Sequence, residues 1–300
     1  MRAVLMHEAL QRAAHRFGDR DALRSGDESW SFRDLDGLSN AFARHLAAQE
    51  VHAGDRVALM TANRMEFVVA IHAISRLGAA AVLLSPAWKQ AEVRHALDLT
   101  QPVHAVADGD TSALVSACLG AGRVTDLDDR STHPFAYSQA LTDLDRVGGD
   151  AEAVLVFSSG TTGLPKAVRH THGSIGLATE HWCTVLGLGQ DDRFQVATPP
   201  SHILGLLNLL AAVSAGATVR LHRRFDLDEV LHRIASERMT LEMAVAPIAL
   251  ALANHPHLED HDLSSLRYIM WGATPVTESV AEAVTRRTGV RWLPAYGASE

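Results

Sequence analysis

One stretch decides the fold of this chain: Val156-Phe157-Ser158-Ser159-Gly160-Thr161-Thr162-Gly163-Leu164-Pro165-Lys166. It places hydroxyl side chains, glycines and a lysine directly after a short apolar run that begins at Ala153, and such a run is typical of a buried strand. Glycines let the backbone approach a polyphosphate, hydroxyl and N–H groups donate hydrogen bonds to it, and a cation offsets its charge. The stretch therefore predicts a phosphate-binding loop at the end of a strand.

The lysine of this loop is unusual for the chain. Of the 27 lysine and arginine residues, only Lys89 and Lys166 are lysines, which indicates that a compact ammonium group is needed at Lys166. The loop is not a Walker A element, because that pattern ends in Gly-Lys-Ser/Thr, whereas Pro165 precedes Lys166 and Ala167 follows it. An ordinary turn between a strand and a helix is the alternative interpretation.

The composition indicates one or two well-buried globular domains, since the chain has 300 residues, 47% of them hydrophobic and 21% charged. A net charge of −8 gives no indication of a nucleic-acid partner, and the apolar stretches are too short to span a bilayer. The first residues lack the features of a secretory signal. Cys118 and Cys183 are isolated, as expected for buried thiols in a reducing cytosol, so we expect a cytoplasmic protein.

The 17 histidines are scattered along the chain. Two close pairs occur, His170 with His172 and His255 with His257, but neither has further ligands at a suitable spacing. We therefore expect no metal site built from histidine.

Short apolar segments alternate with helical periodicity, which predicts an α/β fold with mainly parallel sheets. Ser31 is the expected N-cap of a helix, and Gly78 the expected end of another. The segment 122–149 is rich in Asp, Gly and Ser and predicts a connector between two lobes, 1–150 and 151–300. The expected strands are 56–60, 80–85, 103–107, 153–158, 194–198, 218–221, 242–246, 267–271 and 291–294. The expected helices are 34–50, 66–77, 91–99, 227–238 and 276–288.

The phosphate loop resembles that of the adenylate-forming superfamily, which comprises acyl- and aryl-CoA ligases, luciferases and the adenylation domains of peptide synthetases. Further segments resemble its other signatures in the same order, namely 30–35, 51–59, 63–67, 83–93, 197–206, 221–226, 268–275 and 295–300. The resemblance spans nearly the whole chain and is best for the coumarate–CoA ligase-like and fatty-acid–CoA ligase-like branch. It implies the N-terminal domain of that fold, with two lobes of mainly parallel sheet flanked by helices.

The resemblance implies a role for each signature. The phosphate loop would bind the β- and γ-phosphates of ATP, with Thr161 and Thr162 as direct hydroxyl contacts. Its implied binding residues are Ser158, Ser159, Gly160, Thr161, Thr162, Gly163 and Lys166. Ala167 stands where the family usually has glycine.

His202 would lie between the acid pocket and the nucleotide and would orient the substrate carboxylate. The alternative is a histidine that caps a helix start. The implied wall of the acid pocket is His202, Leu204, Asn208, Ala246, Ala273 and Ala295. Because this wall contains no carboxylate, we expect an acid without an α-ammonium group.

The remaining implied contacts concern CoA, adenine and magnesium. Arg224 would contact CoA, with a solvated cation as the alternative interpretation. Gly272, Ala273 and Thr274 would line the adenine slot, although Trp271 and Thr274 depart from the commoner residues. Tyr296 would stack on adenine next to Gly297, Ser299 would bind the α-phosphate in place of a threonine, and Glu300 would hold Mg²⁺.

The resemblance implies an ATP-dependent carboxylic acid–CoA ligase that forms an acyl-AMP and then a thioester, with Lys166, His202 and Glu300 as its catalytic residues here. The alternatives are an acyl-AMP ligase that loads a carrier protein and a non-catalytic module that binds nucleotide or acid. The family's catalytic lysine lies in a small C-terminal domain, and no lysine follows Lys166. We therefore expect a truncated front part of a longer enzyme, nearly inactive by itself. The residues do not choose between an aromatic ring and an acyl chain, or between CoA and a carrier protein.

Overall fold

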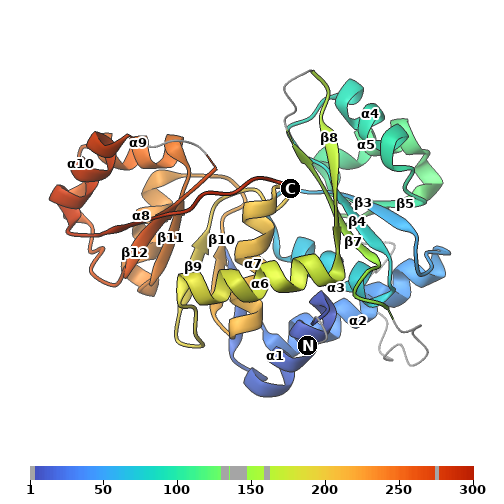
Figure 1. Cartoon of the computed structure of the whole chain (residues 1–300), viewed down its shortest axis with the longest axis horizontal. Helices are drawn as coiled ribbons and strands as arrows, with labels where there is room; N and C mark the ends of the chain where they lie inside the picture. The colour runs from blue at the N-terminus through green and yellow to red at the C-terminus, as the bar shows by residue number, and fades with distance from the viewer. Residues whose placement is uncertain (1–3, 130–134, 136–146, 159–162, 274–276) are drawn as a thin grey trace.

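The computed structural model describes residues 4–129, 135, 147–158, 163–273 and 277–300. Two sheets flanked by helices form the molecule, and Figure 1 shows them side by side. Among the described residues, no helix is both long and apolar enough to cross a membrane.

The six-stranded sheet has the order β6-β5-β3-β4-β7-β8. Its strands are β3 (Arg56–Met60), β4 (Ala80–Leu83), β5 (His104–Ala107), β6 (Val124–Asp126), β7 (Glu152–Ser158) and β8 (Lys166–Thr171). All neighbours are parallel except β7 and β8, which pair antiparallel as a hairpin. The helices that follow its strands are α3 (Met65–Arg76), α4 (Gln90–Thr100) and α5 (Gly109–Leu119), with a short turn η1 (Ala121–Arg123).

The seven-stranded sheet has the order β13-β12-β11-β9-β10-β1-β2. Its strands are β1 (Asp21–Ser25), β2 (Glu28–Ser31), β9 (Arg193–Val196), β10 (Thr218–Leu221), β11 (Leu241–Ala244), β12 (Tyr268–Trp271) and β13 (Trp292–Pro294). Only β1 and β2 pair antiparallel. The remaining helices are α1 (Met6–Phe17), α2 (Phe32–Ala48), α6 (His172–Leu186), α7 (Ile203–Ala215), α8 (Leu227–Glu237), α9 (Ala246–Asn254), η2 (Leu258–Asp260) and α10 (Glu278–Thr288).

The predicted α/β class and the predominance of parallel strands are confirmed. Each predicted strand and helix is present with small shifts at its ends. Ser31 caps α2 as expected, because its hydroxyl accepts a hydrogen bond from the N–H of Asp34 at 3.1 Å. Gly78 follows the last turn of α3 with a φ of +72°, the left-handed conformation that glycine favours after a helix.

The division into sheets does not follow the expected lobes 1–150 and 151–300. Strands β1 and β2 join the seven-stranded sheet, whereas β7 and β8 complete the six-stranded sheet although they follow residue 150. The pairing of β1 with β10 buries Ala22 and Leu23, which explains why the N-terminal strand crosses over. The expected connector 122–149 also begins with a strand, since β6 pairs with β5.

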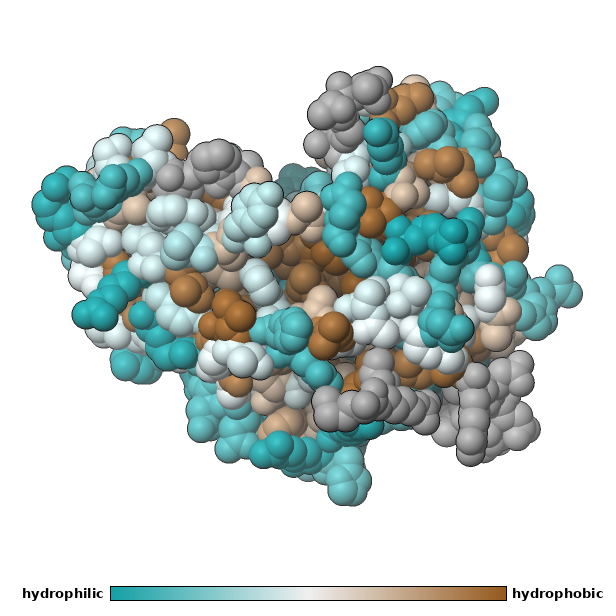
Figure 2. Space-filling view, viewed as in Figure 1, coloured by the Kyte–Doolittle hydropathy of each residue, from teal (hydrophilic) through white to brown (hydrophobic). Residues whose placement is uncertain are grey.

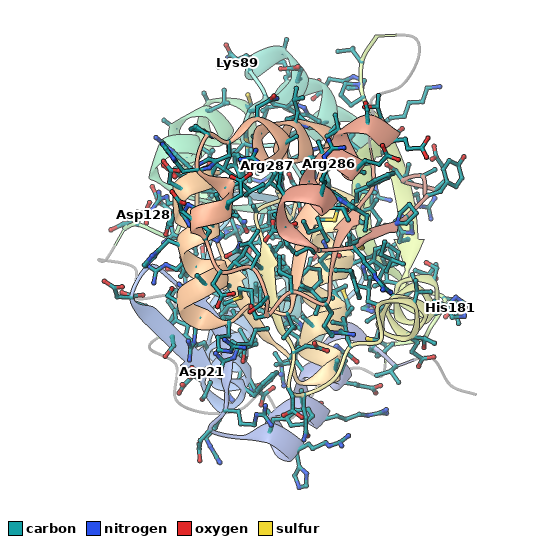
Figure 3. All side chains as sticks on the ribbon, turned by 90° about the vertical axis from the view of Figure 1, so that its left-hand side faces the viewer. Asp21, Lys89, Asp128, His181, Arg286 and Arg287 are labelled. Atoms are coloured by element: carbon teal, nitrogen blue, oxygen red, sulfur yellow. The ribbon has the colours of Figure 1, made fainter. Side chains whose placement is uncertain are left out.

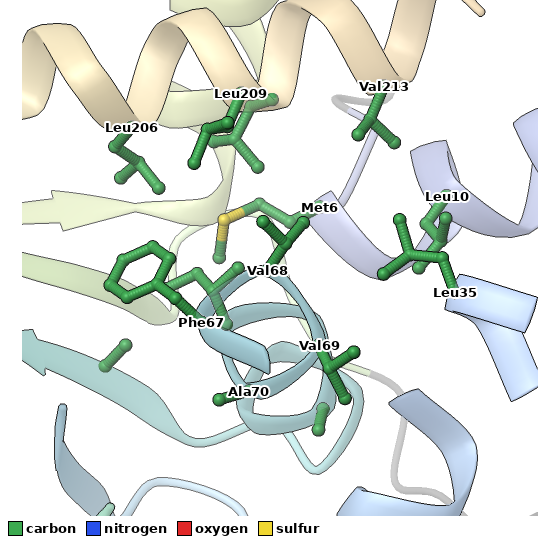
Figure 4. Packing of buried hydrophobic residues seen from close by; sticks show 14 of the residues in the cluster. Met6, Leu10, Leu35, Phe67, Val68, Val69, Ala70, Leu206, Leu209 and Val213 are labelled. Atoms are coloured by element: carbon green, nitrogen blue, oxygen red, sulfur yellow. The ribbon is translucent and has the colours of Figure 1, made fainter. Parts of the chain in front are cut away.

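A shared core holds the two sheets together. Buried residues from both sheets and from α1, α2, α3, α6 and α7 form one continuous apolar cluster. Figure 4 shows part of it, with Phe67, Val68, Val69 and Ala70 of α3 packed between residues of α1, α2 and α7. This core fixes the carboxyl ends of the two sets of parallel strands relative to each other.

Candidate functional site

A cleft of about 860 Å³ lies where loops from the carboxyl ends of both sheets meet. Ligand sites of open α/β sheets characteristically occupy this position. The surface is notched between the two halves of the molecule, as Figure 2 shows. The six-stranded sheet and its helices contribute Thr61, Ala62, Asn63, Pro86, Ala87, Asp108 and Thr111 to the cleft. The other sheet and its helices contribute Ala197, Thr198, Pro199, Pro200, His202, Leu204, Gly205, His222, Arg223, Arg224, Phe225, Val245, Pro247, Ile248 and Ala273.

His202 occupies the N-cap position of α7, but its side chain makes no capping hydrogen bond. The ring is exposed and lines the cleft, and the surrounding walls desolvate it enough to lower its pKa. Gly205, one turn into the helix, explains the close packing here, since a Cβ at this position would clash with the carbonyl oxygen of Pro199. The side chain of His202 therefore does not cap α7, and its imidazole, whose pKa is lowered, faces the cleft.

Four residues of the predicted acid and adenine signatures come together. Leu204 and Ala273 line the cleft. A Cβ on Gly272 would lie 3.2 Å from the carbonyl oxygen of Ala295 and 3.4 Å from Leu204 Cδ2, so glycine leaves room for this close approach. Ala273 has a φ of +65°, a left-handed conformation that costs a non-glycine residue about 1–2 kcal/mol. Backbone strain of this kind is often found at binding sites.

Three predicted pocket residues do not line the cleft, namely Asn208, Ala246 and Ala295, the last of which lies close to Gly272. Asn208 is fully buried, and its Oδ1 accepts a hydrogen bond from Trp182 Nε1 of α6 at 2.8 Å. It belongs to the packing between α6 and α7, because its position along α7 faces α6. Ala246 begins α9 and does not line the cleft, although its neighbours Val245 and Pro247 do.

The phosphate loop closes the β7–β8 hairpin. Ser158 ends β7, Lys166 begins β8, and the two residues pair directly. Gly163 has a φ of +117°, which only glycine adopts readily. Lys166 is exposed and forms no ion pair with the residues that the structure describes. The predicted residues Ser159, Gly160, Thr161, Thr162 and, in the adenine slot, Thr274 lie outside the described residues.

A histidine that the sequence patterns did not indicate holds the end of this loop. His95 of α4 lies with its Nε2 at 3.0 Å from the carbonyl oxygen of Pro165, so the imidazole donates to that carbonyl. The contact fixes the residue directly before Lys166. Since the two residues are 70 positions apart, only the fold reveals this contact.

The last signature runs between the two sheets (Figure 1). Tyr296 is fully exposed at 101% of its reference area, and Gly297 and Glu300 are exposed as well. Ser299 is half-buried, and its carbonyl oxygen accepts a hydrogen bond from His170 Nε2 at 2.8 Å. The Tyr296 ring is therefore accessible for a stacking ligand.

Polar residues missed by the sequence patterns form the opposite wall of the cleft. Asp108 is fully buried, and its Oδ2 accepts a hydrogen bond from the N–H of Ala62 at 2.7 Å. Asn63 Nδ2 donates to the carbonyls of Val196 at 3.2 Å and His222 at 2.9 Å, which ties the two sheets together at the cleft. These residues follow strands in different parts of the sequence, and only the sheet order brings them together.

Two arginine side chains line the cleft on the side of β10. Arg223 and Arg224 are exposed, line the cleft and form no ion pair with the described part of the chain. His222 beside them is buried, which lowers its pKa. Lys89, in contrast, lies at the outer edge of the molecule (Figure 3). The arginines can therefore receive an anionic group, whereas Lys89 does not line the cleft.

Magnesium, which the resemblance implies, needs few protein ligands when it binds with phosphates. No group of three or more His, Cys, Asp or Glu could hold a metal ion within the residues that the structure describes. The exposed carboxylate of Glu300 fits a magnesium ion whose other ligands are phosphate oxygens and waters.

Comparisons with known proteins identify the family of this chain. The family model described as AMP-binding enzyme matches residues 10–300. A 2-succinylbenzoate–CoA ligase of Bacillus licheniformis is 30% identical over 97% of this chain and 59% of its own length. A 4-coumarate–CoA ligase of Oryza sativa is 33% identical over 86% of this chain and 50% of its own length. The chain spans about half the length of the curated relatives it matches.

Solved structures show the same fold. The inhibitor-bound N-terminal domain of FACL13 from Mycobacterium tuberculosis superposes with a TM-score of 0.91 at 24% identity, covering 100% of this chain and 77% of that chain. The anthranilate CoA ligase AuaEII in complex with anthranoyl-AMP superposes with a TM-score of 0.92 at 22% identity, covering 99% of this chain and 60% of that one. Together with the family match along nearly the whole sequence, these findings show that the chain belongs to the family of AMP-binding enzymes.

Proposed function

We propose that this chain forms the nucleotide- and acid-binding part of an ATP-dependent carboxylic acid–CoA ligase. The observation that supports this most directly is the cleft in which His202, an apolar wall and exposed arginines meet at the carboxyl ends of both sheets. The curated relatives named above are CoA ligases.

The first step would join the acid to AMP. A carboxylate oxygen attacks the α-phosphorus of ATP, and the bond to the β-phosphate oxygen breaks, so that acyl-AMP forms and pyrophosphate leaves. Lys166 and the loop from Ser158 would offset the charge of the β- and γ-phosphates, and Ser299 would donate to the α-phosphate. The neutral imidazole of His202 can donate one hydrogen bond to the carboxylate and orient it. Bound magnesium would neutralise phosphate charge, with Glu300 as its protein ligand.

The adenine would lie against Gly272, Ala273 and Thr274, with the exposed ring of Tyr296 stacked on its other face. In the second step, a thiol gives up its proton to solvent, its sulfur attacks the acyl carbon, and AMP leaves with the electron pair of the broken bond. The exposed Arg223 and Arg224 favour CoA as the thiol, because its phosphates need cations. A carrier-protein thiol is the alternative acceptor.

The acid is proposed to be apolar. Leu204, Val245 and Ile248 supply an apolar wall, and the buried carboxylate of Asp108, the acidic residue among the described cleft residues, is already engaged by the N–H of Ala62. An aryl or acyl acid fits such a wall, whereas an α-ammonium group would be buried without a partner. The printed names of relatives include ligases for aryl acids and for fatty acids.

We also propose that the lysine needed for adenylation comes from outside residues 1–300, since these contain only Lys89 and Lys166. The reducing cytoplasm remains the proposed location. Both cysteines are free, and burial raises the pKa of Cys183 to about 11, which keeps this thiol unreactive.

The test is an ATP–pyrophosphate exchange assay on the longest native polypeptide that contains residues 1–300, with a panel of aryl and acyl acids. Exchange that depends on the acid supports adenylation, and thioester formation with CoA but not with a carrier protein supports the ligase. Nucleotide binding without any exchange would favour the non-catalytic alternative.

A further inference from the structure

The final segment, residues 295–300, spans the gap between the two sheets, and we name it the strap. At its start, the N–H of Ala295 donates to the carbonyl of Trp271 in β12 at 2.8 Å. Near its end, the carbonyl of Ser299 accepts from His170 Nε2 in β8 at 2.8 Å. In the described part of the chain, these are the strap's two hydrogen bonds. Figure 1 shows the strap leaving the β12–β13 edge and ending between the halves.

The strap has little other support. Tyr296, Gly297, Ala298 and Glu300 are exposed, and only Ala295 and Ser299 are half-buried. An exposed segment of this length without secondary structure keeps its position only through its end contacts. The hydrogen bond from His170 is therefore the contact that places Ser299 and Glu300 relative to the six-stranded sheet.

His170 also stands in a defined relation to the phosphate loop. Because side chains alternate along a strand, Lys166, Val168 and His170 share one face of β8. Lys166 and His170 are four residues apart, so roughly 13 Å of strand separates them. The pairing of β7 with β8 shifts register between Glu152 and Val154, opposite Thr171 and His170, and such bulges commonly re-aim a side chain.

We propose that His170 is a positioning residue for nucleotide binding. It donates its Nε2–H to the Ser299 carbonyl and holds the strap on the face of β8 that carries Lys166. Phosphate-binding residues at Lys166 and nucleotide-binding residues of the strap are thereby fixed to one strand. The nucleotide that they serve rests on the proposed function above.

The test compares His170→Leu, which removes the donor, with His170→Gln, whose amide can donate in its place. His181→Leu is the control, because His181 is an exposed histidine of α6 (Figure 3). Calorimetry measures the binding of two probes, AMP, which needs the strap, and tripolyphosphate, which needs the loop alone. We expect His170→Leu to weaken AMP binding about three- to tenfold, the range for one hydrogen bond, and to leave tripolyphosphate binding unchanged.

His170→Gln should recover most of the AMP affinity, and His181→Leu should have no effect. A general structural loss would instead weaken both probes, and equal AMP affinity in all variants would overturn the proposal. If the unmodified protein bound neither probe, the proposed function would fail. The role of His170 in positioning the strap would then be tested by a second measurement, the mobility of the strap.

The mobility of the strap is measured as the fluorescence anisotropy of a fluorophore attached to Ala298→Cys. The protein for this measurement has Cys118 and Cys183 replaced by serine. Ala298 is exposed and lies next to Ser299. His170→Leu should lower the anisotropy and His170→Gln should restore it. An unchanged anisotropy in His170→Leu would show that His170 does not hold the strap.

Discussion

Glu242 and Gln195 form a hydrogen-bonded pair in the interior of the seven-stranded sheet. Gln195 Nε2 donates to Glu242 Oε2 at 2.7 Å, and both side chains are fully buried. Burial raises the pKa of Glu242 from 4.5 to about 8, so the carboxyl carries its proton near neutral pH. The hydrogen bond from Gln195 opposes this shift but does not cancel it.

The Glu242 pair predicts a loss of stability as the pH rises. The folded-state pKa exceeds the unfolded value, so the stabilisation is complete below pH 4.5 and disappears as the pH approaches about 8. The free energy of unfolding, measured with urea between pH 6.5 and 8.5, should decrease by an amount on the order of 1 kcal/mol or more. Glu242→Gln should remove most of this slope, and an identical slope in the variant would contradict the assignment.

A second prediction concerns acid. Two buried histidines, His72 and His172, and the half-buried His7 meet where α1, α3 and α6 pack, and His7 Nδ1 lies 3.0 Å from Ser75 Oγ. Burial lowers the pKa of His7 to about 3 and that of His72 to about 4, with further lowering by the charge of Arg76. Other charged groups near these rings are Asp36, which acts on His72, and Glu8, which acts on His172; both oppose the lowering.

Because these folded-state pKa values lie below the unfolded value of 6.5, the histidines stabilise the fold above pH 6.5 and lose this effect as the pH falls. The free energy of unfolding should therefore decrease between pH 6.5 and 4. His72→Gln should make that decrease shallower, even if the variant is less stable at pH 7. A slope equal to that of the unmodified protein would exclude His72 as a contributor.

Lys166→Ala is predicted to weaken the binding of ATP about ten- to hundredfold, the effect of losing one charge-assisted contact. The exposed side chain makes no ion pair with described residues, so the melting temperature should stay unchanged. Lys89→Ala is the matched control, since Lys89 is the other lysine and lies at the outer edge of the molecule. Equal ATP affinity for Lys166→Ala and Lys89→Ala, measured by calorimetry, would count against the phosphate role.

The sequence predicted the elements whose side chains are buried on both faces. Strands such as β3 and β4 read as continuous apolar runs and were found with nearly correct ends. The edge strands β2 and β8 were missed, because none of their residues is fully buried and their sequences contain serine, arginine and histidine. The position of β1 was missed for another reason, since its pairing with β10 joins residues almost 200 positions apart and leaves no local pattern.

The site residues also divide into those that the sequence signatures predicted and those that they did not. His202, Leu204 and Ala273 were predicted from signatures, and the structure places all three at the cleft. Asn63 and Asp108 were not, because a buried polar residue after a strand has no distinguishing neighbour in the sequence. Asn208 was assigned to the pocket wall from the family resemblance, but helical geometry turns it toward Trp182.

Residues 1–300 alone are predicted to bind nucleotide weakly and to catalyse almost no ATP–pyrophosphate exchange. Adenylation needs a cation at the α-phosphate. Of the two lysines, Lys166 lies at the end of the phosphate loop and Lys89 lies at the start of the outer helix α4. The measurement is exchange by purified residues 1–300 beside the longest native polypeptide. Comparable rates in the two samples would show that the cleft is catalytically complete.

The last prediction concerns the acid itself. The cleft wall of Leu204, Val245 and Ile248 is apolar. Among the described lining residues Asp108 is the acidic one, and it already accepts a hydrogen bond from the N–H of Ala62 on its own wall. An α-ammonium group placed there would lose its water without gaining a partner, at a cost of several kcal/mol, and amino acids should therefore be rejected. Ile248→Asp places a carboxylate in the apolar wall and should reduce the kcat/KM for benzoic, cinnamic and octanoic acids, whereas Ile248→Leu, of equal volume, should change it little. A panel of acids with ATP and CoA on the longest native polypeptide measures this, and faster turnover of α-amino acids than of these acids by the unmodified enzyme would refute the pocket assignment.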